Sequence, residues 1–234
     1  MSAFNRYAAI LGFALVSAQA SAVDFSFASA PGTLTQGTGN AYTYTDTLSS
    51  LTLTATAWSN ANKAGNFQVA TLAMAKDGLG ACTSNCKSDS TLNNTINRTS
   101  ASGDLILVTF SQAVNLQSLS LQQPGKDSDL SLWAGTGAFS PAGLKASQLG
   151  TATPYINTNS VAGSRTVSLT TFTGSYDWLA IATSVANLDK TDYAKLKSLT
   201  VNPVAQPVPD PTTWMTMLAG LGLVGFRVSR RTQT

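Results

Sequence analysis

The side chains of this 234-residue chain that could do chemistry are aspartates, two cysteines and a set of aromatic rings. The sequence contains neither histidine nor glutamate. A serine–histidine–aspartate triad and a histidine-ligated metal centre both require an imidazole, so both are excluded. Each remaining group has a structural explanation that competes with the functional one.

Cys82 and Cys86 are the only cysteines and are separated by three residues. A zinc site would need two further ligands, and no histidine exists to supply them. A redox motif would have two residues between the cysteines and a thioredoxin-like setting. If the chain is exported to an oxidising compartment, a local disulfide that closes a long loop is the simple outcome. We expect this disulfide to be structural.

Asp127 and Asp129 flank Ser128 just before an expected strand. Extracellular β domains often bind calcium through loop carboxylates and carbonyls, and Asp104 or Asp77 could complete such a site. Only two carboxylates are neighbours in the sequence, however. A turn in which aspartate side chains accept hydrogen bonds from backbone N–H groups is therefore favoured. We expect no cofactor, and Asp127 and Asp129 are the residues to test for calcium.

A pair of carboxylates could hydrolyse a glycosidic bond, one as acid and the other as base or nucleophile. The aspartates that would have to serve are Asp104, Asp127, Asp129 and Asp177. Nothing in their sequence context distinguishes an acid from a nucleophile. We therefore expect that the protein is not an enzyme, and a glycan hydrolase is the least favoured of the functions considered.

Aromatic rings could offer platforms on which sugar rings stack. The candidates are Trp58, Trp133, Tyr155, Tyr176 and Trp178. In a β domain such residues more often pack in the core, and packing is favoured here. A carbohydrate-binding module would instead need an exposed aromatic cluster on one sheet face or loop rim.

Alternation of apolar and polar residues with period two predicts about ten short strands. Leu51, Leu53, Ala55 and Ala57 share one face of such a strand. Residues 104–110 are almost continuously apolar, which predicts a central strand covered on both faces. The expected strands are residues 23–28, 41–47, 50–58, 67–74, 104–110, 114–121, 128–134, 165–172, 177–183 and 196–201.

Two stretches interrupt this strand pattern. Residues 76–103 are rich in Gly, Asn, Ser and Thr and are expected to be irregular. Pro141 follows Ser140 and could open a short helix that ends at residue 149. Many short strands separated by turn residues predict an all-β fold, and more finely an antiparallel β-sandwich of the jelly-roll type. A closed barrel is the alternative.

The first 22 residues have the pattern of a secretory signal peptide. Arg6 supplies the positive charge, residues 7–16 form the apolar core, and Ala20 and Ala22 supply the small side chains of a cleavage site. We expect cleavage before Val23. The mature chain would then lie outside the cytoplasm.

The last 27 residues contain three parts in a fixed order. Pro209 and Pro211, together with Pro207 just before this stretch, keep the chain extended. A Leu- and Gly-rich apolar run follows and predicts a helix over about residues 214–228. The run would rise only about 20 Å over residues 214–226, against roughly 30 Å of hydrocarbon, which favours a temporary membrane anchor. A basic tip of Arg227, Arg230 and Arg231 should remain on the cytoplasmic side.

This C-terminal stretch resembles the PEP-CTERM sorting signal, whose usual form is Val-Pro-Glu-Pro-Ser-Thr-Trp followed by a Leu/Gly-rich helix and an arginine cluster. Asp210 stands where the pattern has Glu, and Thr212 where it has Ser. The resemblance implies that exosortase, a membrane transpeptidase-like enzyme of exopolysaccharide-producing bacteria, recognises and processes the tail. The motif residues are Val208, Pro209, Asp210, Pro211, Thr212, Thr213 and Trp214.

A second resemblance covers the middle of the chain. Residues 78–82 (Gly-Leu-Gly-Ala-Cys), 104–110 and 127–133 are similar to segments of a family of exosortase-dependent surface proteins. Members of that family often carry an Asp-Asn pair where this chain has Ile96, Asn97 and Arg98. This resemblance implies a location at the cell surface and implies no activity.

The charge distribution agrees with a division into targeting segments and a neutral domain. Residues 23–209 contain eight Lys and two Arg against ten Asp, so the formal charge of +3 belongs to the two ends. A nucleic-acid surface is therefore not expected. We expect a signal peptide (1–22), a β-sandwich domain (23–202), a proline-containing linker (203–207) and a sorting tail (208–234).

The function predicted from these features is that of a secreted, non-enzymatic protein of the cell surface or extracellular matrix. Its expected partners are the secretion translocon, signal peptidase and exosortase, with the inner membrane as a temporary anchor for the precursor. The alternative is a β-sandwich module that binds carbohydrate, such as an exopolysaccharide.

Overall fold

The computed structural model describes residues 21–27, 40–60, 65–75, 77–82, 96–97, 103–123, 128–156, 163–183 and 192–205. The chain divides into two units, residues 1–204 and 205–234. Apart from Ala205, all described residues belong to the first unit, whose described part is called the β unit below. The expected sorting tail and almost all of the expected signal peptide lie outside the described residues.

The β unit is an all-β fold, as predicted, and its recorded strand pairs are antiparallel. Among the described residues the only helical element is a single 3-10 turn, η1 (Ala146–Gln148). No helix in that part of the chain is long and apolar enough to cross a membrane. The strands are β1 (Val23–Ser26), β2 (Ala41–Thr45), β3 (Thr52–Asn60), β4 (Gln68–Val69), β5 (Thr71–Ala75), β6 (Gly78–Cys82), β7 (Ile96–Asn97), β8 (Gly103–Gln123), β9 (Leu130–Gly135), β10 (Thr153–Tyr155), β11 (Gly163–Ser168), β12 (Tyr176–Thr183) and β13 (Tyr193–Pro203).

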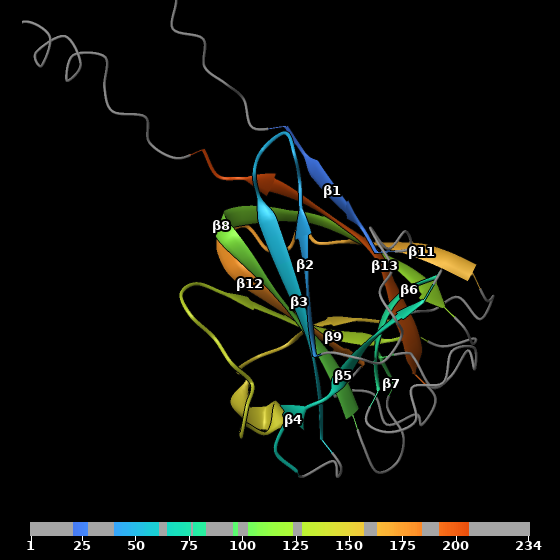
Figure 1. Cartoon of the computed structure of the whole chain (residues 1–234). Coiled ribbons are helices and arrows are strands. Elements are labelled where there is room, and N and C mark those ends of the chain that lie inside the picture. Colours follow the sequence, from blue (N-terminus) through green and yellow to red (C-terminus); the bar gives the residue numbers. More distant parts are fainter. Residues whose placement is uncertain are drawn as a thin grey trace, which may run out of the picture. The chain divides into compact units, whose positions relative to one another are not determined.

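Strand β8 connects the two halves of the sheet and is the longest element of the β unit (Figure 1). Its first half, residues 103–110, lies between β3 and β12. Its second half, residues 114–122, pairs with β13 and, from residue 118 onward, also with β11. The sequence predicted two separate strands here, and the structure joins them into one.

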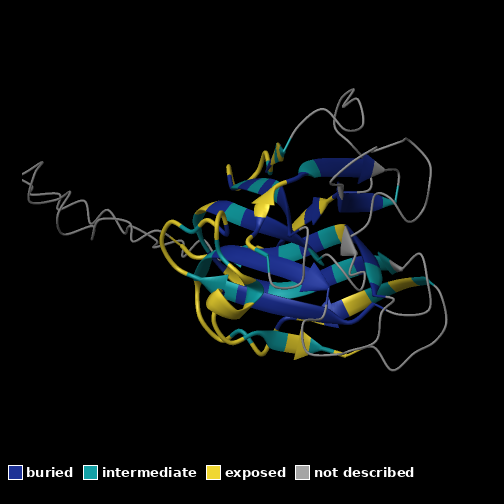
Figure 2. Cartoon of the chain, turned by 90° about the horizontal axis from the view of Figure 1, so that it is seen from below, coloured by how far each residue is buried: buried dark blue, intermediate teal, exposed yellow. Residues whose placement is uncertain are grey.

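The first half of the sheet has the order β2, β3, β8, β12, β9 and β10, with β4 beside the end of β3. The second half places β13 beside β8, with β1, β6 and β7 on β13 and β5 on β6. The two halves pack their apolar faces against each other. Figure 2 shows buried residues concentrated in the strands and exposed residues mainly in the connections.

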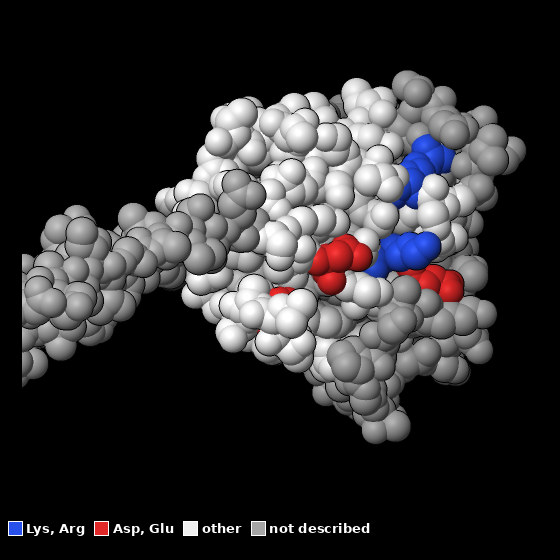
Figure 3. Space-filling view, turned by 90° about the horizontal axis from the view of Figure 1, so that it is seen from above, with Lys and Arg blue, Asp and Glu red and all other residues white. Residues whose placement is uncertain are grey.

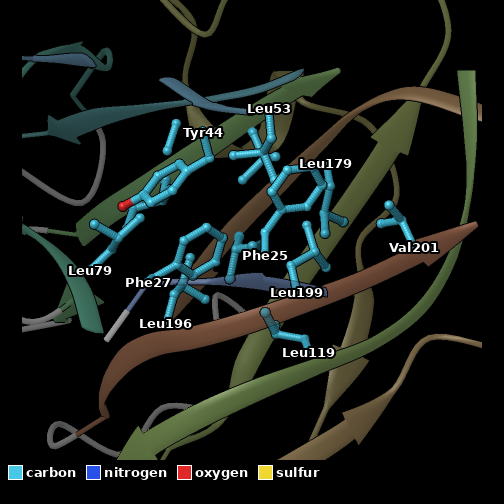
Figure 4. Close-up of a cluster of buried hydrophobic side chains, with 14 of the residues drawn as sticks. Phe25, Phe27, Tyr44, Leu53, Leu79, Leu119, Leu179, Leu196, Leu199 and Val201 are labelled. Carbon is cyan, nitrogen blue, oxygen red and sulfur yellow. The ribbon is translucent and has the colours of Figure 1, made fainter. Parts of the chain in front are cut away.

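An inner layer of apolar side chains fills the space between the two halves of the sheet. Leu51, Leu53, Ala55 and Ala57 belong to it and are fully buried, which confirms the face predicted from their alternation. Figure 4 shows side chains from β1, β3, β12 and β13 meeting in this layer. Burial of each Leu-sized side chain contributes roughly 1.5–3 kcal/mol relative to exposure.

A second, smaller group of apolar side chains covers the opposite face of β3, β8 and β12 and is called the outer layer. It consists of Trp58, Phe67, Leu105, Leu107, Trp133, Leu149, Trp178, Ala180 and Ala182. In β8, Leu105 and Leu107 face the outer layer, whereas Ile106 and Val108 face the inner one. The predicted central strand covered on both faces is therefore confirmed.

Residues 136–152 cover much of the outer layer and do not form the helix expected over residues 140–149. Gly143 has a φ of +75°, outside the helical region. Its N–H donates to the Phe67 carbonyl at 3.0 Å, while the Phe67 N–H donates to the Leu144 carbonyl at 2.8 Å. The Leu144 carbonyl, which would accept an intrahelical hydrogen bond from the N–H of residue 148, is thus bonded to a distant segment, and only η1 remains.

Residues 76–103 also differ from expectation, because β6 and β7 lie within the stretch predicted to be irregular. Gly78 begins β6 with a φ of +130°, and a Cβ atom there would lie 2.1 Å from the Leu196 carbonyl oxygen. Only glycine allows this close approach to β13. The approach lets Leu79 pair with Leu196 and join β6 to the second half of the sheet.

Candidate functional site

Several of the residues predicted to carry function lie outside the described part of the chain. These are the sorting motif, the basic tip, Ala20, Cys86 and Asp127. Cys82 ends β6 and Val23 begins β1. The cleavage site, the disulfide and the processing of the tail therefore remain predictions.

The described aspartates are placed in different surroundings. Asp129 is buried, and its N–H donates to the Asp192 carboxylate at 3.1 Å. Asp104 is buried at the start of β8, where it pairs across the strands with Ser59. Among the described residues no three Asp or Cys side chains come close enough to hold a metal ion. The calcium hypothesis also involves Asp127 and remains a prediction.

Asp177 lies at the other end of β12 from Asp104. Because Ala182 pairs with Leu105, Asp104 lies beside Thr183, the last residue of β12. Asp177 comes six residues earlier in the same strand, and six residues of strand span about 20 Å. Glycosidase carboxylates are roughly 5–10 Å apart. Asp177 instead accepts a hydrogen bond from the Gly137 N–H at 2.6 Å and fixes the turn after β9. The structure therefore does not bring these two candidates together.

The predicted aromatic residues are mostly packed, as the favoured interpretation held. Trp58, Trp133 and Trp178 are buried in the outer layer. Tyr155 and Tyr176 are partly buried against the inner layer. Three of the five nevertheless share one hollow, which makes this hollow the candidate site.

This hollow, called the β9 pocket, lies at the edge of β9 and has a volume of about 490 Å³. Strand β10 pairs only with residues 130–132, so Trp133 and Ala134 have β12 on one side and the pocket on the other. No charged side chain is among the lining residues. They are Leu132, Trp133, Ala134, Leu149, Gly150, Thr151, Thr153, Thr171, Phe172, Tyr176 and Trp178.

One wall of the β9 pocket is the segment that leads into β10. The indole N–H of Trp133 donates to the Gly150 carbonyl at 3.1 Å and holds this segment against the outer layer. Gly150 has a φ of +93°, a conformation that side-chain-bearing residues rarely adopt. Thr151 is exposed at the rim, and Thr153 is half-buried.

The opposite wall comes from the connection between β11 and β12. The rings of Phe172 and Tyr176 meet edge to face, with centroids 5.8 Å apart and planes at 89°. The Tyr176 hydroxyl accepts a hydrogen bond from the Gly174 N–H at 3.3 Å. Sequence reasoning placed Phe172 at the end of an expected strand, 165–172, and gave it no role. In the structure β11 ends at Ser168, and Phe172 lies in the connection that brings it to Tyr176.

Trp178 belongs to both the outer layer and the pocket lining. Its ring stacks on Phe139 with centroids 4.0 Å apart and planes at 15°. Gly135 packs against the same ring, because a Cβ atom at this position would lie only 2.3 Å from it. The Trp178 indole N–H is buried and donates to no group in the described part of the chain. Trp178 is therefore firmly held but has an unused hydrogen-bond donor.

A second hollow of about 470 Å³ lies between β1 and β2, at the edges of the two halves of the sheet. Asp24 and Asp46 lie in its lining. Asp24 accepts a hydrogen bond from the Thr200 hydroxyl at 3.1 Å. Hydrogen bonds from the Ser49 hydroxyl and N–H lower the pKa of Asp46 below its usual value. Each carboxylate thus already has a structural role.

The surface of the β unit is weakly charged. Figure 3 shows a face on which a few Lys, Arg and Asp side chains are surrounded by uncharged residues. Lys195, itself buried, has its ammonium group 3.6 Å from the Asp77 carboxylate. This face therefore offers no broad basic patch for a polyanion.

Comparison with family models found no match to this chain, and a search of the curated proteins found no similar sequence.

Proposed function

We propose that this protein is exported and reaches the cell surface or extracellular matrix through its C-terminal sorting signal. One observation carries the proposal: the proline-spaced motif, the apolar run and the arginine tip follow one another within 27 residues. Each part has a different physical role, namely an extended recognition segment, a membrane anchor and a cytoplasmic stop. Their combination in this order is more specific than any one of them.

The proposal treats the tail as a removable address outside the β domain. The last recorded pairing of the fold joins Pro203 to Val114, and the Val204 N–H donates to the Ala113 carbonyl at 2.9 Å. The motif begins at Val208, four residues later. We propose a jelly-roll-like β-sandwich as the finer description of the domain, and exosortase as the enzyme that processes the tail.

The experiment compares the surface-associated protein in cells with and without exosortase. We expect a mature form that lacks residues 214–234 only when the enzyme is present, as measured by mass spectrometry of the recovered C-terminus. A variant truncated after Thr213 should fold and be released into the periplasm or medium. A mature form that retains the complete tail in both strains would show that the tail is an ordinary anchor.

A paired substitution tests the basic tip. Replacement of Arg230 and Arg231 with Ala should weaken retention of the precursor, because the arginines oppose movement of the helix end across the membrane. The matched control replaces Arg165 and Lys197 of the β unit with Ala and leaves the tip intact. Cell fractionation should show loss of retention only in the first variant. Equal retention in both would remove the role assigned to the tip.

A second candidate function is carbohydrate binding by the β domain. The observation that favours it is the β9 pocket, which combines aromatic and threonine side chains in one uncharged lining. The two functions are compatible, because a matrix protein can be sorted by its tail and bind a glycan through its domain. A non-enzymatic role is proposed for both.

A further inference from the structure

We propose that the β9 pocket binds a neutral saccharide, with a sugar ring against Phe172 and Tyr176 and its hydroxyls bonded to the rim threonines. The inference rests on the second candidate function and deepens it, because it assigns the site and the chemical class of the ligand. It does not depend on the sorting signal.

The charge of the lining argues for a neutral ligand. All eleven lining residues are uncharged. The nearest carboxylate in sequence, Asp177, is used by the Gly137 N–H at 2.6 Å. An anionic or cationic ligand would lose hydration on entry and find no counter-charge in return. The pocket therefore favours a ligand without formal charge.

The pairing of aromatic rings with hydroxyls argues for a sugar. A sugar ring has a face of C–H groups and an edge of hydroxyl groups. Aromatic side chains receive the apolar face, while threonine hydroxyls both donate and accept at the edge. Phe172 and Tyr176 are half-buried, Thr171 is exposed next to Phe172, and Thr151 is exposed on the opposite wall. A purely apolar ligand would form no hydrogen bonds with the threonine hydroxyls.

The size of the pocket suits a small saccharide. Its volume of about 490 Å³ lies within the roughly 300–1,000 Å³ that is common for ligand pockets. A single water occupies only about 30 Å³. The floor of Leu132, Trp133 and Trp178 is buried and fixed by the outer layer, so the site is preformed and little ordering is needed on binding.

The test is isothermal titration calorimetry of the purified full chain with neutral oligosaccharides: cellohexaose, laminarihexaose, xylohexaose and mannohexaose. An acidic oligogalacturonate serves as comparison. We expect at least one neutral probe to bind and to change tryptophan emission, because Trp133 and Trp178 line the pocket. Absence of binding by all four neutral probes at millimolar concentration, or preference for the acidic probe, would overturn the proposal.

Variants show whether the binding occurs in the β9 pocket. Thr171→Arg places a long charged side chain at the rim without removal of a core group, and Phe172→Ala removes an aromatic face. Each should weaken binding by about tenfold or more. The matched control is Thr166→Arg, which makes the same change at an exposed position on β11 outside the lining. It should bind within about twofold of the parent.

Equal affinity in Thr171→Arg, Phe172→Ala and the parent would place the ligand elsewhere and overturn the assignment. Thermal unfolding of each variant separates loss of binding from loss of folding. The pocket variants should still be sorted and processed like the parent. Failure of the sorting proposal and failure of the saccharide proposal are therefore distinguishable.

Discussion

The inner and outer layers share the strands β3, β8 and β12 but are built differently. The inner layer is mainly aliphatic and is enclosed by strands on both sides. The outer layer contains three tryptophans, and much of its cover is residues 136–152, which have no regular structure beyond η1. The same strands therefore face a layer enclosed by strands on one side and a layer covered by an irregular segment on the other.

The difference explains where the candidate site lies. An inner layer between two hydrogen-bonded halves cannot open without separation of strands. The outer cover is tied down at separate points, by backbone bonds between Phe67 and Gly143 or Leu144 and by the Trp133–Gly150 bond. Where this cover ends at β10, the edge of β9 is left beside a hollow. The sheet face that is covered by a loop thus leaves room for a pocket, whereas the face that is covered by strands does not.

The largest expected effect compares the same truncation in the two layers. Leu53 and Leu105 are both fully buried, the first in the inner layer and the second in the outer. Leu53→Ala should lower the free energy of unfolding by about 3–5 kcal/mol, and Leu105→Ala by about 2–3 kcal/mol. The outer cover can settle into the gap, whereas the paired strands cannot. Urea unfolding of both variants measures this, and equal losses would show that the layers are equally rigid.

A smaller effect compares two tryptophans within the outer layer. Trp133→Phe and Trp178→Phe remove similar volume, but only the first breaks a hydrogen bond and leaves the Gly150 carbonyl without its donor. The second removes a donor that has no partner among the described residues. Trp133→Phe should therefore cost about 1–2 kcal/mol more than Trp178→Phe. Matched urea unfolding curves decide this. A larger cost for Trp178→Phe would mean that its stack on Phe139 outweighs the hydrogen-bond difference.

The elements predicted correctly from the sequence are those determined by local alternation. Leu51 to Ala57 and residues 104–110 carry their pattern within one strand, so burial of one or both faces follows from the sequence directly. The aromatic residues were correctly expected to pack. These features depend on neighbours two residues away and on no distant partner.

The elements that were missed depend on contacts between distant segments. Residues 140–149 have a helix-opening Pro, but Phe67 binds the Leu144 carbonyl that a helix would use. Strand β6 exists because Gly78 fits against Leu196. The β9 pocket unites Phe172 with Trp133 through a turn and a strand edge, and no sequence pattern records that meeting. The sorting motif is the opposite case, because it is contiguous and can be read directly from the chain.

The smallest expected effect at neutral pH comes from the hydroxyl of Tyr44, a residue of the inner layer that is labelled in Figure 4. Tyr44 lies against Phe27, with ring centroids 5.0 Å apart, and its hydroxyl has no hydrogen-bond partner in the described part of the chain. Tyr44→Phe should therefore change the free energy of unfolding at pH 7 by no more than about 1 kcal/mol, in the stabilising direction. Inner-layer packing stays intact because the ring is kept.

The pH dependence of the same substitution gives the sharper result. Burial, and then the neighbouring Tyr42, raise the pKa of Tyr44 well above its usual range. Above about pH 10 the unfolded chain therefore loses this proton while the folded chain keeps it, so the parent loses stability as the pH rises. The loss approaches about 1.4 kcal/mol per pH unit for this group, and Tyr44→Phe lacks it. Urea unfolding between pH 9 and pH 11 should thus show a widening advantage for the variant. Parallel curves would mean that the Tyr44 hydroxyl ionises as readily in the folded protein as in the unfolded chain, and that burial in the inner layer does not raise its pKa.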